Sequence, residues 1–439
     1  MRIHTDQSPE LAKLLATANT DALRDYAAEL ERVVDEADWQ APECSVCLPG
    51  AEQLATESRE LVNSLVGTGV QYVFLVGIGG SNLGTVAIHN ALRNRFARTE
   101  APELINLDTV SAVDIATLQK RFGDGLDPAS YIVFIISKSG GTAETIANAE
   151  FLYQAVLTDP AAKTERTVVI TDADSALDQF AATEQMARLH IPQQVGGRYS
   201  VFSPVGIAPL LALGYDTAAL LQGARDILPY CVRQDVSDNP ALAAAAATAA
   251  AISSGYRVYD LFVFDPALES LGKWNRQLLG ESVGKRENSS GEVVETGIVP
   301  TVSVGSTDLH SVGQLYLGGV PTVLTMFVSV AKTAENYAIA TTDSERQLPT
   351  LVSDITDRSS NDINQAILSG TKDAYNNVAR PFCEAELADI SAYELGAFMQ
   401  YKMLETMYLA RALSVNAFNQ PNVELYKTFT KAYLRNQTN

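Results

Sequence analysis

The stretch YIVFIISKSGGTAETIANAEF, residues 131–151, decides how the rest of this chain is interpreted. A run of large apolar side chains ends at Ile136, small hydroxyl and glycine residues follow, and a helix-like pattern then begins. A continuous apolar run, rather than an alternating one, indicates a strand that is buried on both faces. A strand that passes through a glycine-rich turn into a helix predicts an α/β fold with parallel strands.

Similar runs recur on both sides of this stretch, separated by helix-like sequence. We expect further strands at YVFLVG from Tyr72, LINLDTV from Leu104, TVVITD from Thr167, YDLFVF from Tyr259, GIVPTVSVG from Gly297 and PTVLTMFVSV from Pro321. Apolar residues at helical spacing over 9–36 and 395–413 indicate helices near the two ends. The chain therefore predicts two domains, each a mostly parallel sheet with helices on both faces.

The expected domain ranges are an N-terminal helical segment over 1–45, a first domain over 46–220, and a second domain with C-terminal helices over 221–439. With 439 residues and 46% hydrophobic composition, the chain is long enough for two buried cores.

Charge and composition limit the partners that this protein can have. The formal net charge is −20, and nucleic acid binding usually needs a basic surface, so we expect no nucleic acid partner. The N-terminal residues lack the pattern of a signal peptide, and no apolar run approaches the roughly 20 residues of a membrane span. We therefore expect a soluble, cytoplasmic protein with no membrane partner.

The cysteines give a weaker signal. Cys44 and Cys47 form a single CxxC motif flanked by prolines, without a second ligand pair and without a preceding strand. We favour a structural role for this pair and keep a redox or metal role as the alternative.

The loop after the strand at Tyr131 is suited to binding a phosphate monoester. Ser137, Ser139 and Thr142 offer three hydroxyl groups beside a helix N-terminus, and the glycines allow the backbone to approach a ligand closely. The loop lacks the Gly-Lys-Ser/Thr ending of a nucleotide P-loop, which disfavours a triphosphate. The alternative is an ordinary serine-rich helix cap.

The first strand ends in the loop VGIGGSNLG, which permits two interpretations. A dinucleotide-binding loop would need glycine at the position of Asn82, although Asp108 lies at a suitable distance in sequence for a ribose contact. The other interpretation is a second anion-binding turn, with Ser81 offering its hydroxyl.

Residues suited to catalysis or to contact with a ligand occur in four further segments. They are Arg198 in VGGRYSVFSPVG, Glu281 in RQLLGESVGK, His310 in VGSTDLHSVGQ, and Gln420 with Lys427 in NQPNVELYK. His310 is at a strand end and a helix start, where a proton-transfer histidine would be placed. Taken singly, the arginine, the glutamate and the last segment are weak signals, because such residues are more often solvated surface groups.

Together these segments resemble the phosphoglucose isomerase family in its shorter bacterial form. The resemblance runs from about Gly77 to Lys427 and rests on six motifs in the family's order: GIGGSNLG, SKSGGTAET, GGRYS, GESVGK, STDLHS and QPNVELYK. It implies two sugar isomerase (SIS) domains. It also implies the reversible conversion of glucose 6-phosphate to fructose 6-phosphate, in glycolysis and gluconeogenesis, through ring opening and a cis-enediol intermediate, with no metal and no cofactor.

The resemblance also assigns roles to residues by their position in the motifs. Ser137, Ser139 and Thr142, accompanied by Lys138, would hold the sugar phosphate, while Gly80, Ser81, Gln277 and Gln420 would contact the substrate. Glu281 would be the base that moves the proton between C2 and C1, His310 and Lys427 would open the ring, and Arg198 would lie beside the enediolate. Glu144 would orient the histidine. In the family this histidine comes from the neighbouring subunit, which implies a homodimer.

The motifs depart from the family pattern at Gly141, Asn422 and Tyr426, which could alter affinity or substrate preference. Two alternatives to a strict glucose 6-phosphate isomerase stay open. One is a dual phosphoglucose/phosphomannose isomerase, or an isomerase of another sugar phosphate. The other is a non-catalytic, phosphosugar-binding SIS protein, which would not need Glu281, His310 and Lys427 together.

Overall fold

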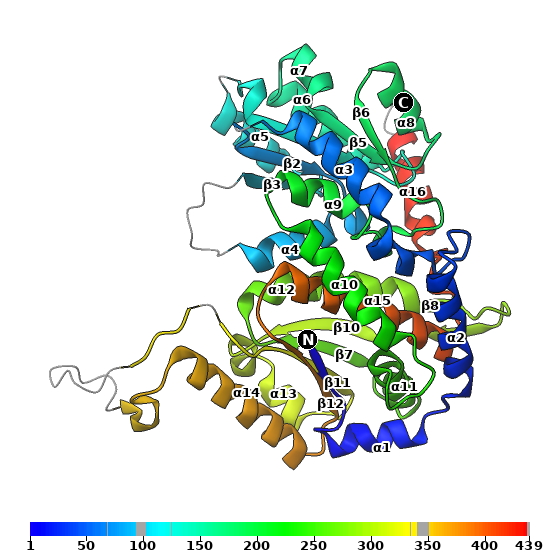
Figure 1. Ribbon diagram of the computed structural model, residues 1–439, viewed down its shortest axis with the longest axis vertical. Coiled ribbons are helices and arrows are strands. Elements are labelled where there is room, and N and C mark those ends of the chain that lie inside the picture. Colours follow the sequence, from blue (N-terminus) through cyan, green and yellow to red (C-terminus); the bar gives the residue numbers. More distant parts are fainter. Residues whose placement is uncertain (68, 94–101, 124, 334, 340–350, 437–439) are drawn as a thin grey trace. The chain divides into compact units, whose positions relative to one another are not determined.

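The chain folds into two compact units, shown in Figure 1. In this computed structural model the described residues are 1–67, 69–93, 102–123, 125–333, 335–339 and 351–436. Unit 1 comprises Met1–Ala27 and Arg233–Asn439, and unit 2 comprises Ala28–Val232.

Unit 2 is built on a parallel five-stranded sheet. In chain order its strands are β2 (Tyr72–Val76), β3 (Glu103–Leu107), β4 (Tyr131–Ile136), β5 (Thr167–Thr171) and β6 (Ala187–His190). They lie in the order β3-β2-β4-β5-β6, so the chain changes direction across the sheet between β2 and β4. In open parallel sheets, ligands bind at the carboxyl ends of the strands at such a switch point. The loops after β2 and β4 are the two glycine-rich loops of the sequence.

Helices cover both faces of this sheet. They are η1 (Cys44–Gly50), α3 (Glu52–Leu65), η2 (Gly79–Ser81), α4 (Leu83–Leu92), α5 (Ala112–Phe122), η3 (Pro128–Ser130), α6 (Ala143–Ala155), α7 (Pro160–Glu165), α8 (Ala176–Thr183), η4 (Gly197–Tyr199), α9 (Pro204–Ala212) and α10 (Thr217–Cys231). Phe74 and Val133 point to the face that α5 and α6 cover, where they join the cluster around Phe122 and Leu152. The strand residues of opposite parity are also buried, because α9 packs on β2 and β4 and α3 packs on α9.

Unit 1 contains a second five-stranded sheet. Its strands are β1 (Arg2–His4), β7 (Val258–Val263), β10 (Val299–Val304), β11 (Val323–Val330) and β12 (Phe382–Leu387), in the order β1-β12-β11-β7-β10. All pairings are parallel except that of β1 with β12. A hairpin of β8 (Lys285–Glu287) and β9 (Val293–Thr296) is separate from this sheet. Here too the strand order reverses, between β7 and β11.

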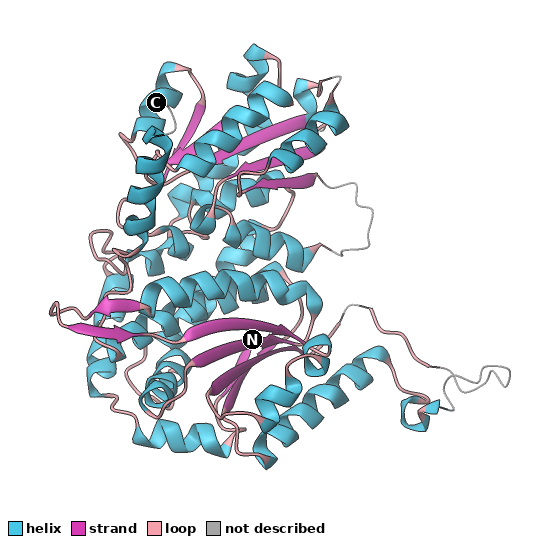
Figure 2. Cartoon of the chain, turned by 180° about the vertical axis from the view of Figure 1, so that it is seen from behind, coloured by secondary structure: helices cyan, strands magenta, loops and turns pink. Residues whose placement is uncertain are grey.

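Helices of unit 1 lie on both faces of its sheet, as Figure 2 shows from behind. The helical segments of the whole unit are α1 (Pro9–Thr17), α11 (Pro240–Ser253), η5 (Pro266–Leu268), α12 (Glu269–Val283), η6 (Thr307–His310), α13 (Gly313–Gly318), η8 (Ser353–Ile355), α14 (Ser360–Asn377), α15 (Ala392–Ala412) and α16 (Val423–Asn436), of which η8 and α16 are drawn away from the sheet. Helix α2 (Asp21–Asp35) contains the division between the units. No helix in the described ranges is long and apolar enough to cross a membrane.

The predicted α/β class with two mostly parallel sheets is confirmed, and each of the seven predicted strands is present. Three strands of the two sheets were not predicted: β1, β6 and β12. In β12 the glutamates break the apolar run, although Glu384 is buried in the sheet. Its carboxylate accepts hydrogen bonds from Lys372 Nζ at 2.8 Å and Ser329 Oγ at 2.6 Å.

The compact units differ from the predicted domain ranges 1–45, 46–220 and 221–439 at the N-terminus. Residues 1–27 belong to unit 1, because β1 pairs with β12 and α1 packs on α11. The second boundary between the units lies at the end of α10, after residue 232, whereas the predicted domain boundary is near residue 220.

Candidate active site

The loop between β4 and α6 leads into a helix N-terminus whose N-cap side chain makes no capping hydrogen bond. Thr142 is the N-cap of α6, but its hydroxyl lies 3.0 Å from Ser137 Oγ and makes no capping hydrogen bond to the helix. The first backbone N–H groups of α6 are therefore not used by this side chain and are suited to a negatively charged ligand. Gly140 adopts a left-handed φ of 69°, a conformation that favours glycine.

Lys138 is held beside this loop by two partners in unit 2. Its ammonium donates to Asp172 Oδ1 at 2.9 Å and to the carbonyl oxygen of Gln193 at 2.8 Å. The loop backbone is fixed as well, because Thr171 Oγ1 donates to the Ser137 carbonyl at 2.6 Å. The Lys138 charge is thus compensated by a carboxylate, and its position depends on the segment that contains Gln193.

The loops that contain Gly80 and Arg198 are in direct backbone contact. A Cβ on Gly80 would lie 2.6 Å from the Arg198 nitrogen and would also clash with Gly197, so only glycine fits at this position. Ser200 Oγ bridges the two loops by donating to the carbonyl oxygens of Gly197 at 2.7 Å and Gly80 at 3.4 Å. Arg198 is almost fully buried, with 3% of its surface exposed. The fold thus brings Gly80, Ser81 and Arg198 together at the end of β2.

Asp108 has a structural role, which disfavours the dinucleotide interpretation of this loop. Its Oδ2 atom accepts hydrogen bonds from Asn82 Nδ2 at 3.1 Å and from Asn106 Nδ2 at 3.0 Å. The carboxylate that would contact a ribose therefore holds Asn82, the residue that stands where the dinucleotide pattern needs glycine.

In unit 1, helix α12 places Gln277 and Glu281 one turn apart on the same face. Gln277 Nε2 donates to Glu281 Oε1 at 3.0 Å. Gly272 lets the helix approach β10, since a Cβ there would lie 2.5 Å from Val302 Cγ1. The predicted base and the predicted substrate contact are therefore neighbours on a helix that is packed tightly against the sheet.

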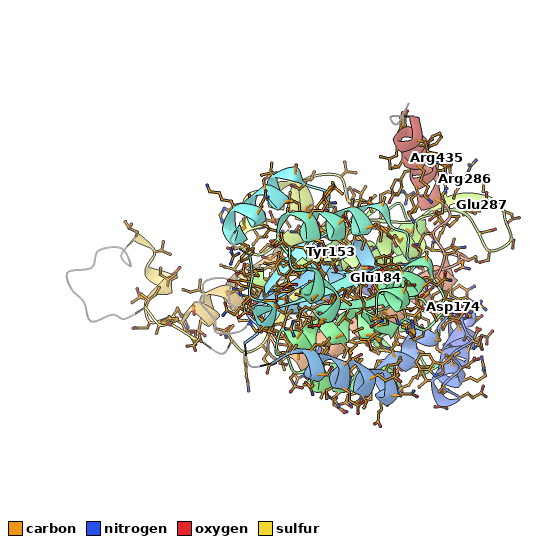
Figure 3. All side chains as sticks on the ribbon, turned by 90° about the horizontal axis from the view of Figure 1, so that it is seen from above. Tyr153, Asp174, Glu184, Arg286, Glu287 and Arg435 are labelled. Atoms are coloured by element: carbon orange, nitrogen blue, oxygen red, sulfur yellow. The ribbon has the colours of Figure 1, made fainter. Side chains whose placement is uncertain are left out.

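Lys285 joins the end of α12 to the C-terminal motif. Its ammonium donates to the carbonyl oxygens of Glu281 at 2.6 Å and Asn419 at 2.5 Å. The side chain is buried, whereas Arg286 and Glu287 on the same strand are exposed, as Figure 3 shows. Since Asn419 directly precedes Gln420, this lysine brings Gln420 toward the helix that contains Glu281.

His310 ends the short helix η6 after β10 and is exposed to solvent. Asp308 builds the turn, because its Oδ2 accepts from the backbone N–H of Val304 at 2.7 Å and its Oδ1 from Ser311 Oγ at 2.7 Å. His310 lies six residues beyond the end of β10 and three residues before α13 begins, so it is between the strand and the helix rather than at the strand end itself.

Lys427 lies on α16, one helical turn after Glu424, and its ammonium pairs with that carboxylate at 2.7 Å. Glu144 is in the first turn of α6, beside the phosphate loop. Of the three departures from the family pattern, Gly141 has open space around its Cα, and Asn422 and Tyr426 are exposed. Each of the three positions could therefore accept another side chain without a change in the fold.

The CxxC pair is buried in η1 of unit 2, and its surroundings favour the structural role. Burial raises the pKa of Cys44 to about 12 and that of Cys47 to about 11. Cys47 Sγ donates to the Val33 carbonyl oxygen at 3.3 Å. Thiols with raised pKa values are poor nucleophiles and poor metal ligands.

Sequence reasoning missed the residues that position the candidate groups. Asp172 accepts a hydrogen bond from Lys138, and Lys285 donates one to the Glu281 carbonyl. Asp308 accepts a backbone hydrogen bond in the turn that leads to His310. Lys285 and Asp308 are inside the quoted motifs, but their partners are decided by the fold and have no local signal.

Similar proteins identify the family to which this chain belongs. Residues 60–439 match the phosphoglucose isomerase family. A relative from Carboxydothermus hydrogenoformans, named glucose-6-phosphate isomerase, is 30% identical and aligns over 83% of this chain and 79% of its own. A relative of the same name from Rubrobacter xylanophilus is 31% identical over 88% and 87% of the two chains.

Solved structures show the same fold. A hypothetical protein from Thermus thermophilus superposes with a TM-score of 0.82 at 28% identity, covering 99% of both chains. A glucose-6-phosphate isomerase from Chlamydia trachomatis gives a TM-score of 0.76 at 19% identity, over 90% of this chain and 75% of its own. From the family match and these relatives, the chain belongs to the phosphoglucose isomerase family.

Proposed function

We propose that this protein interconverts glucose 6-phosphate and fructose 6-phosphate as an aldose–ketose isomerase. The observation that carries the proposal is the family match over residues 60–439, and the Ser137–Thr142 contact and the Gln277–Glu281 hydrogen bond support it. Because catalytic groups accompany the phosphate loop, a non-catalytic sugar-binding protein is not favoured.

Unit 2 would bind the substrate through its phosphate. The hydroxyls of Ser137, Ser139 and Thr142 and the N-terminus of α6 would donate hydrogen bonds to the phosphate oxygens. Lys138 would add a positive charge whose position is set by Asp172. Fixing the phosphate end limits the orientations of the sugar. The entropy lost in orienting the reactants is a large part of the barrier in reactions of this kind, so a fixed phosphate lowers the barrier.

The residues of the other motifs would supply the proton transfers. His310 and Lys427 would open the sugar ring, because a histidine exchanges protons near neutral pH. Glu281 would then remove the C2 proton and return it to C1, a form of general acid–base catalysis that contributes about 10²–10⁴-fold to rate. Gln277 would orient the Glu281 carboxylate and contact the substrate, with Gln420 as a further contact. Arg198 would stabilise the negative charge of the enediolate.

We further propose that the protein acts as a cytoplasmic homodimer in which His310 completes the site of the neighbouring subunit. The exposure of His310 supports this arrangement, because a side chain that serves a neighbouring subunit must be reachable from outside its own chain. Mixing inactive His310→Ala and Glu281→Gln chains tests it, because hybrid dimers would regain one intact site. Activity that stays absent after verified exchange of chains would argue for a histidine acting within its own chain.

The activity is tested by NMR of glucose 6-phosphate incubated with the protein in D₂O. We expect fructose 6-phosphate to appear, with deuterium at C2 of the recovered glucose 6-phosphate, because the C2 proton exchanges through an enediol. Mannose 6-phosphate in the same sample would indicate the dual phosphoglucose/phosphomannose activity. Binding without any exchange would overturn the isomerase proposal and favour a sugar-binding protein.

A further inference from the structure

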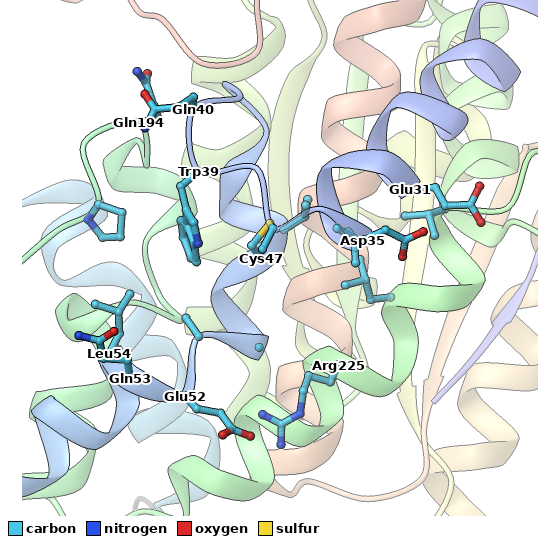
Figure 4. A pocket seen from close by; sticks show the side chains of 18 of the residues that line it. Glu31, Asp35, Trp39, Gln40, Cys47, Glu52, Gln53, Leu54, Gln194 and Arg225 are labelled. Carbon is cyan, nitrogen blue, oxygen red and sulfur yellow. The ribbon is translucent and has the colours of Figure 1, made fainter.

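Unit 2 contains a cavity of about 880 Å³ that the proposed reaction does not use. Its walls come from the end of α2, from η1 and the start of α3, from the segment 192–194 and from α10. Figure 4 shows the Trp39 indole in the middle of the cavity, near Cys47. This volume is in the range of sites that bind small organic molecules.

The cavity combines an apolar floor with an acidic rim. Val46 and Leu228 are buried at its floor, and the half-buried Trp39 adds an aromatic face. The carboxylates that line it are Glu31, Asp35, Glu52 and Glu57. The cation of the lining, Arg225, donates to the Pro49 carbonyl at 2.8 Å and to Gln222 Oε1 at 2.6 Å.

The rim carries a net negative charge. Figure 4 shows Glu52 and Arg225 pointing toward one another, so Arg225 offsets one of the carboxylates. Three carboxylates remain in the lining, which also includes the Trp39 ring, and an aromatic ring attracts cations at its face. An anionic ligand would be repelled from this cavity, whereas an amphipathic cation would be attracted to both the rim and the floor.

We propose that this cavity is a second ligand site that binds a linear aliphatic polyamine. Its ammonium groups would pair with Asp35 and Glu57, and its methylene chain would lie over Trp39. The cavity wall also contacts the proposed active site, because the Gln193 carbonyl accepts the hydrogen bond from Lys138 at 2.8 Å. A polyamine against Gln193 would therefore change the position of Lys138, and this coupling rests on the proposed function of the phosphate loop.

The test is a titration of the full-length protein with spermidine, followed by tryptophan fluorescence. The chain has two tryptophans, and Trp274 is buried in α12, so a polyamine in the cavity acts on the Trp39 signal. We expect saturable quenching that Trp39→Phe abolishes. The double variant Asp35→Asn/Glu57→Gln should weaken binding roughly tenfold, since each exposed ion pair contributes about two- to fivefold in affinity. Glu60→Gln, the same change one turn further along α3 and outside the cavity, should bind as the wild type does.

Three results would overturn the proposal of a polyamine site. They are equal quenching by sodium chloride at matched ionic strength, equal affinity for the uncharged octanediol, and undiminished binding by the double variant. The coupling is measured separately, as a several-fold change in the KM for glucose 6-phosphate at saturating spermidine. Fluorescence binding with an unchanged KM would overturn the coupling alone. A protein that binds spermidine but never isomerises the sugar would overturn the proposed function and leave the site intact.

Discussion

Replacing Lys285 by methionine should disable the enzyme while leaving its substrate-binding loops in place. Methionine keeps the apolar stem of the side chain and removes the ammonium that joins the carbonyl oxygens of Glu281 and Asn419. The segment that leads into Gln420 then loses its link to the end of α12. We expect a loss of turnover through misplacement of Glu281 and Gln420, although Lys285 itself performs no chemistry.

The magnitude follows from the two hydrogen bonds and the burial of the charge. Each bond from a charged donor contributes about 1.5–3 kcal/mol, and removing the buried ammonium recovers several kcal/mol of its desolvation cost. We therefore expect the free energy of unfolding to fall by about 1–3 kcal/mol. A catalytic group displaced by about 1 Å can lose about 10²-fold in rate, so kcat should fall roughly 10- to 100-fold.

The assay measures kcat and KM for glucose 6-phosphate together with the melting temperature. Lys273→Met is the matched control, because Lys273 lies on α12 itself but pairs with Glu269 on the exposed surface. Exposed pairs contribute about 0–1 kcal/mol, so this control should behave as the wild type does. Lys285→Arg, which keeps the charge and adds donors, should recover part of kcat.

Two results would refute the reasoning. One is a Lys285→Met variant with kcat within about twofold of the wild type, far short of the loss expected for a displaced catalytic group. The other is a loss of activity that follows thermal unfolding alone, with kcat normal in the fraction that remains folded. In either case the bridge between α12 and Asn419 would have no catalytic consequence.

The remaining predictions address the base, the phosphate loop and a buried histidine. Glu281→Gln should keep sugar phosphate binding, measured by calorimetry, and lose nearly all turnover; activity near the wild-type rate would show that another group is the base. Ser139→Ala/Thr142→Ala should raise KM more than it lowers kcat, and an unchanged KM would argue against a phosphate loop. Burial, with help from Arg93, lowers the pKa of His89 from 6.5 to about 4. Between these values the unfolded chain takes up a proton that the native protein does not, so the free energy of unfolding should fall by about 3 kcal/mol as pH decreases through this window. Urea unfolding at about pH 7.5 and about pH 4, on either side of this window, would measure the fall, and His89→Gln should reduce it; an equal fall in the variant would assign it to other groups.

The sequence by itself determined the fold class and the candidate chemistry. Continuous apolar runs such as that ending at Ile136 predicted buried parallel strands, because such strands have no solvent-facing side. The loops after β2 and β4 were recognisable because glycine and hydroxyl residues at a strand end have a local physical meaning. Glu281 and His310 were found through the order of motifs, which is also a property of the sequence alone.

Only the tertiary structure decided which of these residues support one another. Three contacts join residues that lie between 34 and 134 positions apart in the sequence. They are the contact of Gly80 with Gly197, the ion pair of Lys138 with Asp172, and the hydrogen bond from Lys285 to the Asn419 carbonyl. Strand β12 escaped prediction for the same reason, since Glu384 is tolerated in the core only through Lys372 and Ser329. Local patterns report how a segment is solvated, whereas the partner of a buried charge depends on how distant segments pack together.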